Sequence, residues 1–223
     1  MRRTLLPVLA ASLTAAALPV VADATHKPGH NPGNPGPGGA DLTIAAKPNP
    51  TVFQGPTVIS GKLKGAPAAV TLREDAHPFG SGDTPVATVQ SDQSGSYSFT
   101  RRPSVNTTYQ VTSGTVRSVR VLVNVRIRMS LRVSDSTPRA GRLVRFTGRA
   151  CPKHNGLAVR IQRKVGTGSF RTVRSTTLKP STRGCSAYSR RLRVSRDATY
   201  RVTADDADHA RGFSAPRFLN VHR

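Results

Sequence analysis

Apolar and polar residues alternate without a break through the middle of the chain. Residues 119–133 read VRVLVNVRIRMSLRV, with every odd-numbered position apolar and arginine at four of the even-numbered positions. A period of two is typical of β-strands that bury one face and expose the other. A single strand of this length would span about 50 Å, well beyond the usual strand. We therefore expect two consecutive strands that meet near residue 125 or 126.

The chain from residue 41 onward contains an internal repeat. Tyr97 and Tyr109 are twelve residues apart, as are Tyr188 and Tyr200, and the second pair follows the first by 91 positions. Each copy consists of short period-two segments separated by turn sequences such as HNG and GTG. No helical period is present. About seven short strands in each copy predict two β-sandwiches.

The sequences NTTYQV and DATYRV, around Tyr109 and Tyr200, resemble the tyrosine corner of immunoglobulin-like sandwiches. The sequence DQSGSYSF, residues 92–99, is similar to a hairpin of bacterial immunoglobulin-like and carboxypeptidase-regulatory-like surface modules. The resemblance covers residues 41–223. It implies tandem sandwiches with Tyr109 and Tyr200 at the tyrosine corners, and a binding or spacer role. The chain lacks tryptophan and has Val202 where antibody domains carry a core cysteine, so antibody-type recognition is not implied.

The predicted fold class is therefore all-β, with two tandem immunoglobulin-like sandwiches behind a signal peptide and a disordered Pro/Gly-rich linker. We place the signal peptide at residues 1–24, the linker at 25–40, the first sandwich at 41–125 and the second at 126–223. The first segment has two arginines, an apolar stretch and the sequence ADA, which is typical of a cleaved export signal. A retained membrane anchor is the alternative, because the apolar stretch is near spanning length.

Two cysteines, Cys151 and Cys185, lie in the second copy. An even number of cysteines in an exported chain predicts a disulfide. Closing a loop of about 35 residues would stabilise the second sandwich by roughly 3–4 kcal/mol. The alternatives are a free thiol or a metal site, since Cys151-Pro-Lys-His154 has half of the required ligands.

Other candidate chemistry is sparse. Asp205, Asp206 and Asp208 form a weak calcium candidate, because clustered carboxylates suit that ion, and the alternative is that they pair with nearby arginines. Glu74, Asp75 and His77 are a loose acid–histidine group without a recognisable catalytic motif. We expect a protein that is not an enzyme, and we expect neither a cofactor nor a small-molecule substrate.

The positive charge is concentrated in the second copy. The chain carries a net charge of +23. Residues 41–115 have six basic and five acidic groups, a net +1, whereas residues 116–223 have 25 basic and five acidic groups, a net +20. One genome encodes both halves, so arginine-rich codon usage does not explain the difference. The strand pattern places arginines on one outward face of the second sandwich: Arg126, Arg128, Arg132, Arg145, Arg149, Arg191 and Arg193.

Guanidinium groups bind phosphate and sulfate in bidentate fashion, so we expect this face to bind anionic polymers. Candidate partners are wall polymers, acidic polysaccharide and extracellular DNA bound without sequence preference, and another surface protein is a further candidate. The resulting hypothesis is an extracellular adhesion or spacer protein that is either secreted or associated with the cell wall. The alternative is a partner-specific protein binder or inhibitor that uses residues 205–213 at one end of the sandwich.

Overall fold

The computed structural model describes residues 41–65 and 67–223, so the predicted signal peptide and linker lie outside the described residues. Every regular element in these ranges is a β-strand. None of the described residues forms a helix with the length and apolar character needed to span a membrane. The prediction of an all-β protein is confirmed.

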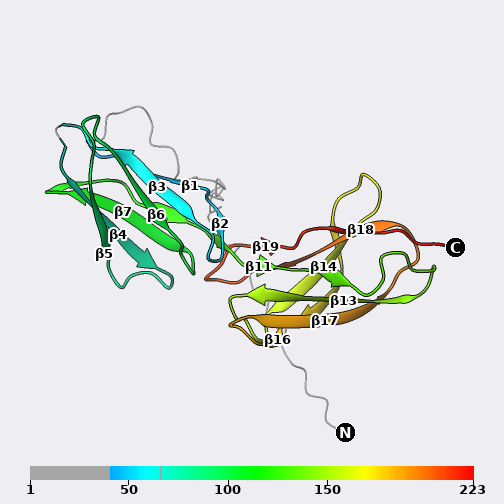
Figure 1. Cartoon of the computed structure of the whole chain (residues 1–223). Helices are drawn as coiled ribbons and strands as arrows, with labels where there is room; N and C mark the ends of the chain where they lie inside the picture. The colour runs from blue at the N-terminus through cyan, green and yellow to red at the C-terminus, as the bar shows by residue number, and fades with distance from the viewer. Residues whose placement is uncertain (1–40, 66) are drawn as a thin grey trace, which may run out of the picture. The chain divides into compact units, whose positions relative to one another are not determined.

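The first sandwich has two antiparallel sheets (Figure 1). One sheet has the order β1-β3-β6, with strands Ala45–Lys47, Thr57–Lys62 and Ser96–Arg101. The other has the order β5-β4-β7-β8, with strands Thr84–Gln90, Ala69–Ala76, Thr107–Ser113 and Val116–Arg117, and β9 (Val121–Val123) also pairs with β7. The inward residues of both sheets form one hydrophobic core, which includes Ile59, Leu72 and Val111.

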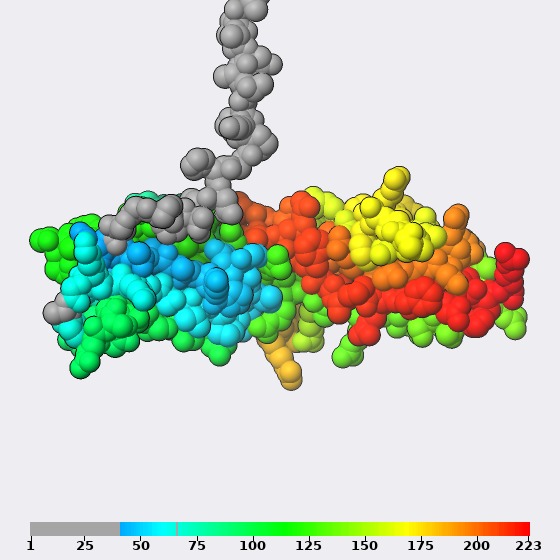
Figure 2. Space-filling model, turned by 90° about the horizontal axis from the view of Figure 1, so that it is seen from above, coloured from blue at the N-terminus to red at the C-terminus, as the bar shows by residue number. Residues whose placement is uncertain are grey.

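The second sandwich repeats this plan (Figure 1). One sheet has the order β11-β13-β17-β16, with strands Arg128–Met129, Leu143–Cys151, Ser186–Arg193 and Lys179–Pro180, and β12 (Arg132–Val133) also pairs with β13. The other has the order β15-β14-β18-β19, with strands Arg171–Thr177, Ala158–Lys164, Ala198–Ala204 and Gly212–Phe213. The last strand, β20 (Arg217–Leu219), pairs with β18, and Figure 2 shows this C-terminal segment, in red, at the surface.

The strand order identifies both sandwiches as immunoglobulin-like. In the second sandwich the chain leaves the β13 sheet for β14 and β15, returns to β17, and then crosses again to β18. The first sandwich makes the same crossings with β3, β4, β6 and β7. This Greek-key arrangement of two packed antiparallel sheets defines the immunoglobulin-like architecture. The all-β part of the predicted fold class, two immunoglobulin-like sandwiches, is confirmed, whereas the predicted signal peptide and linker stay predictions.

The alternating segment at residues 119–133 forms four short strands, so the expectation of two strands was wrong. β9 pairs with β7, β10 (Val125–Arg126) pairs with β2 (Thr51–Val52), and β11 and β12 pair with β13. The partner strand changes twice, from β7 to β2 and then to β13, because the chain passes from one sandwich to the next. Every odd-numbered residue from Val121 to Leu131 nevertheless stays buried. The pattern therefore reports burial correctly and strand length incorrectly.

A disulfide joins Cys151, at the end of β13, to Cys185, just before β17. Both strands belong to the same sheet. The predicted disulfide is confirmed, and the alternatives of a free thiol or a cysteine-ligated metal do not apply to these two residues.

Candidate functional site: an arginine face on the second sandwich

Six of the seven predicted arginines lie on the outer face of the β11-β13-β17 sheet. In the ladder between β13 and β17, Arg145 is directly opposite Arg191, and their inward neighbours Val144 and Leu192 are buried. Directly paired residues project to the same side of a sheet. The remaining four follow the same alternation and are exposed. We call this set the arginine face: Arg128, Arg132, Arg145, Arg149, Arg191 and Arg193.

Arg126 does not belong to this face. It lies on β10, which pairs with β2, and it forms a bridge with Ala210. The strand order explains the difference, because the chain joins the β13 sheet only at Arg128. The structure thus brings together six predicted arginines and separates the seventh.

Among the described residues, no carboxylate forms an ion pair with the arginine face. In residues 41–65 and 67–223, none of the six arginines forms an ion pair. Arg128 and Arg193 donate hydrogen bonds to the carbonyl oxygens of Phe53 and Gly141, at 2.5 Å and 2.6 Å, which leaves their charge intact. Arg145 and Arg191 face each other across the ladder, and like charges in that position destabilise a sheet.

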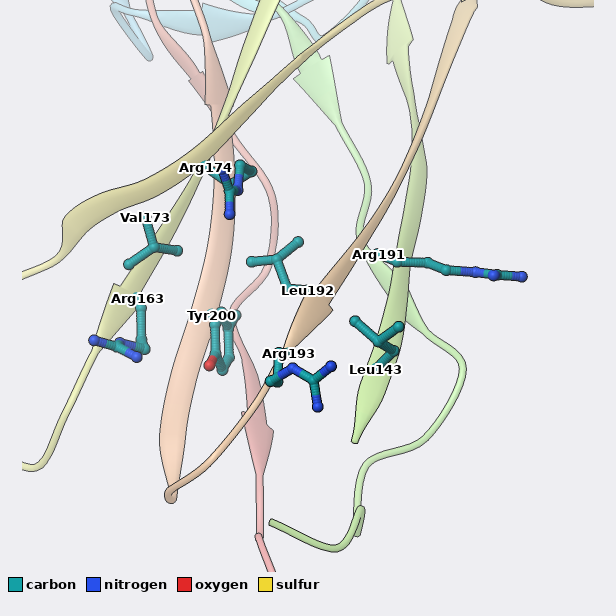
Figure 3. A pocket seen from close by; sticks show the side chains of 8 residues that line it. All are labelled: Leu143, Arg163, Val173, Arg174, Arg191, Leu192, Arg193 and Tyr200. Atoms are coloured by element: carbon teal, nitrogen blue, oxygen red, sulfur yellow. The ribbon is translucent and has the colours of Figure 1, made fainter. Parts of the chain in front are cut away.

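A polar cavity of about 550 Å³ adjoins the arginine face at the edge of β17 (Figure 3). Its lining is shared between the two sheets and includes four arginines: Arg163, Arg174, Arg191 and Arg193. Figure 3 shows the side chain of Arg191 pointing away from the others, while Arg163 lies beside Tyr200. Arg191 and Arg193 belong to both the face and the cavity, so the basic surface continues around the sheet edge.

Sequence reasoning missed Arg163 and Arg174. They lie on β14 and β15, in the sheet opposite the arginine face. The strand pattern assigns each residue a side of its own sheet, and it does not show which edges of two sheets come together. No local signal was available for these two residues.

Tyr109 and Tyr200, the predicted tyrosine-corner residues, are buried on β7 and β18. Tyr200 packs against Phe146, with ring centroids 5.0 Å apart. The hydroxyl groups that donate to distant backbone carbonyls belong to the earlier tyrosine of each copy. Tyr188 donates to the carbonyl of Ser130 at 2.7 Å, and Tyr97 donates to that of Thr43. The role proposed for Tyr109 and Tyr200 stays a prediction.

The acid–histidine group of the first sandwich is divided among separate contacts. Glu74 forms an ion pair with Arg101 at 3.0 Å. Asp75 accepts a hydrogen bond from the amide of Gly80 at 2.9 Å, and His77 packs edge-on against Phe79. Among the described residues, His77 forms no hydrogen bond to either acid, so these three residues do not assemble a proton-transfer pair.

The carboxylates of the second-sandwich loop also separate. Asp205 binds Arg160 at 2.6 Å and Arg211 at 3.1 Å. Asp206 and Asp208 instead turn towards His154 and His209, and ligand atoms of these four residues lie within 4.8 Å of one another. The calcium site proposed for Asp205, Asp206 and Asp208 stays a prediction, with two of its three carboxylates in one cluster.

The pKa values of Asp206 and Asp208 shift in opposite directions. Burial and a hydrogen bond with Asp208 raise the pKa of Asp206 to about 6. Burial acts to raise the pKa of Asp208 as well, but hydrogen bonds with Asp206 and His209 dominate and lower it to about 2. The pair therefore holds a proton more readily than two exposed aspartates would.

Backbone hydrogen bonds to other segments hold the central part of residues 205–213 in place. The amide of Asn106 donates to the carbonyl of Asp208 at 2.9 Å, and the amide of Ala210 donates to that of Val125 at 2.8 Å. His209 is 2% exposed. The partner-binding role of this segment stays a prediction, since these contacts give its central residues an internal structural role.

Comparison with protein-family models finds no match, and comparison with curated proteins finds none either. Among solved structures, the chain is similar to a tetra-tandem repeat in the extending region of a large adhesion protein, with 17% identity, a TM-score of 0.34, and coverage of 81% of this chain and 49% of that one. It is also similar to the D0-D1 domain of intimin, with 13% identity, a TM-score of 0.29, and coverage of 81% and 97%. The chain spans about half the length of the first structure. Its assignment as a tandem immunoglobulin-like β-sandwich protein rests on its own strand order.

Proposed function

We propose that this protein is an exported, non-enzymatic surface adhesion or spacer protein that docks on anionic polymers through the arginine face. The chemical class of the partner is a linear polymer carrying phosphate or sulfate esters, because guanidinium groups bind both in bidentate fashion. The N-terminal segment predicts export. The disulfide supports an oxidising compartment, since such bonds persist mainly outside the cytosol.

One observation carries the proposal: six arginines share one sheet face, and none has a carboxylate partner within the described residues. A concentrated charge of one sign destabilises the folded state through self-repulsion. A bound polyanion would relieve that repulsion and release its own condensed counterions. The cavity beside Arg191 and Arg193 extends the basic surface, so a polymer chain could contact both sheets at this edge.

The test uses the full chain with two surface charges reversed. The Arg145→Glu/Arg191→Glu variant removes the central pair of the arginine face. The control, Arg117→Glu/Arg171→Glu, changes the net charge equally at exposed positions on β8 and β15. Binding to double-stranded DNA and to a sulfated polysaccharide is measured across a salt gradient. We expect the first variant to lose about tenfold or more in affinity relative to the control.

The salt dependence distinguishes docking on the arginine face from diffuse attraction. Each phosphate contact contributes about 0.9 to the slope of log K against log salt concentration on B-form DNA. Losing two contacts should make the slope shallower by roughly 2. If both variants weaken binding equally and keep the same slope, the attraction comes from net charge alone and the proposed face is wrong.

A further inference from the structure

Two histidines and two aspartates meet in the second sandwich without any arginine among them. His154 Nδ1 lies 2.8 Å from Asp206 Oδ2, and His209 Nδ1 lies 2.9 Å from Asp208 Oδ1 and 3.6 Å from Asp206 Oδ1. The two imidazole rings stand edge to face, with centroids 4.9 Å apart. We call these four residues the His–Asp cluster.

Among the described residues, no arginine or lysine side chain pairs with the two aspartates of the His–Asp cluster. Asp205, the adjacent residue, binds two arginines. Within the described ranges, neither Asp206 nor Asp208 has an ion pair with arginine or lysine, although this half of the chain has 25 basic residues. Two neighbouring, partly buried carboxylates are stabilised either by nearby positive charge or by a shared proton. Here only the histidines face them.

Both ring nitrogens of His209 lie at hydrogen-bond distance from oxygen atoms, Nδ1 from Asp208 Oδ1 and Nε2 from a backbone carbonyl. Its Nε2 atom lies 2.8 Å from the carbonyl oxygen of Ser104. A carbonyl only accepts hydrogen bonds, so Nε2 carries the hydrogen and the Nδ1 atom of a neutral ring presents its lone pair. That lone pair faces the carboxylate of Asp208 at 2.9 Å, so the contact needs either a proton or a metal ion that both groups can share. Metal-bound histidines commonly donate their second N–H to a backbone carbonyl in this way.

His154 is less completely bonded. Its amide donates to the hydroxyl of Ser186 at 2.9 Å, which fixes the backbone at this position. Its Nε2 atom is buried and, in the part of the chain that the structure describes, has no hydrogen-bond partner. The side chain of Asp208 is 37% exposed, so an ion has a path from solvent to the cluster.

We infer that the His–Asp cluster binds a divalent transition metal ion of the zinc class. Two imidazole nitrogens and two carboxylate oxygens form a donor set that zinc accepts in tetrahedral geometry. Donor atoms around tetrahedral zinc lie about 3.3 Å apart, given bonds of about 2.0–2.1 Å, and the four donor atoms here lie within 4.8 Å of one another. Calcium requires six to eight oxygen ligands, so a site with two imidazoles favours the softer ion.

The ion would join parts of the chain that are distant in sequence. His154 follows β13, whereas Asp206, Asp208 and His209 lie between β18 and β19. These segments belong to different sheets of the second sandwich. Binding of the ion should therefore raise the free energy of unfolding, because the site exists only in the folded chain.

Zinc and cobalt(II) are the probes, and the full chain is treated first with a chelator. We expect one zinc ion per chain by titration calorimetry, a rise in the thermal unfolding midpoint, and the visible absorption of tetrahedral cobalt(II). Asp208→Asn and His154→Gln should each weaken zinc binding by about tenfold or more. Circular dichroism should report an unchanged β-sheet signal, because both replacements are polar and similar in size to the original side chains.

Two control variants test other sources of zinc binding. His77→Gln removes a histidine from the first sandwich, and His26→Ala/His30→Ala removes both histidines of the Pro/Gly-rich segment. Zinc affinity should be unchanged in both. Binding that persists in Asp208→Asn and His154→Gln, binding lost with His26 and His30, or displacement of zinc by excess calcium would each overturn the inference. An absence of zinc binding to the wild-type chain would overturn the inference directly.

Discussion

At the scale of single residues, the same glycine–tyrosine contact occurs in both sandwiches. Gly148 is directly opposite Tyr188 in the ladder, and Gly61 is directly opposite Tyr97. In each sandwich the tyrosine hydroxyl passes over the glycine and donates a hydrogen bond to a backbone carbonyl. The acceptor is the carbonyl of Ser130 in the second sandwich and that of Thr43 in the first. A Cβ atom on either glycine would collide with both the hydroxyl and that carbonyl. Both positions therefore require glycine because the space is filled.

Substitutions that disrupt this glycine–tyrosine contact should lower the stability of the folded protein. We expect Gly148→Ala to lower the free energy of unfolding by about 1–3 kcal/mol through overpacking. Tyr188→Phe should cost about 1 kcal/mol, since it removes one hydrogen bond to Ser130. Urea denaturation measures both. Tyr200→Phe is the matched control, and a larger loss for this control than for Tyr188→Phe would favour Tyr200 as the anchoring hydroxyl.

The four buried tyrosines predict that the folded protein loses stability at alkaline pH. Burial raises the pKa of Tyr97, Tyr109, Tyr188 and Tyr200 above the ordinary value, and raises that of Tyr109 to about 12. The unfolded chain ionises its tyrosines near pH 10 and therefore loses protons first. Stability from these groups is complete below pH 10 and falls as the pH rises towards 12.

Ultraviolet absorbance of tyrosinate provides the measurement. The native protein should show little tyrosinate at pH 10, where the denatured chain is about half ionised. One or more tyrosines that titrate normally in the native protein would contradict the burial of these rings.

At the scale of elements, the second sandwich has a covalent link that the first lacks. The bond between Cys151 and Cys185 joins the β13 and β17 ends of one sheet. In both sandwiches a buried serine hydroxyl holds the segment after a central strand against that strand by a hydrogen bond. Ser118 accepts from the amide of Val111, and Ser214 accepts from that of Val202, both at 3.1 Å. The two copies thus share their hydrogen-bonding devices and differ in the disulfide.

Removing the disulfide should affect the second sandwich selectively. We expect Cys151→Ser/Cys185→Ser to lose roughly 3–4 kcal/mol, because the unfolded chain regains the freedom of a closed loop of about 35 residues. Hydrogen exchange locates the effect. Amides of β13 and β17 should exchange faster, whereas those of β4 and β7 should be unchanged. Equal acceleration in both sandwiches would show that they unfold as one unit.

At the scale of the whole molecule, the excess positive charge opposes folding and favours polyanion binding. The net charge of +23 comes almost entirely from the second half of the chain. The opposed pair Arg145 and Arg191 places part of that repulsion inside a single ladder. Screening by salt or a bound anion should therefore change both stability and affinity.

Stability and binding should respond in opposite directions to one substitution. Arg191→Glu creates a cross-strand pair of opposite charge with Arg145, which should stabilise the fold by about 0.2–1 kcal/mol at low salt. The same change should weaken DNA binding. Thermal unfolding at low and high ionic strength measures the first effect, which should shrink as screening increases. A destabilised variant at low salt would argue that the two side chains do not face each other.

The sequence by itself determined the features that depend on local pattern and on counts. The period of two in residues 119–133 indicated buried and exposed faces, the spacing of the tyrosines indicated two copies, and the two cysteines indicated a disulfide. Each of these follows from neighbouring residues or from composition. The excess of arginine in the second half was also visible at this level.

Only the tertiary structure decided which side chains meet. Strand order removed Arg126 from the arginine face and brought Arg163 and Arg174 to its edge. It also brought His154 to Asp206, some fifty residues later in the chain. Alternation is a property of one strand, whereas sheet pairing and packing depend on contacts between distant segments. A sequence pattern therefore fixes the side of a strand on which a residue lies, and the fold determines its neighbours.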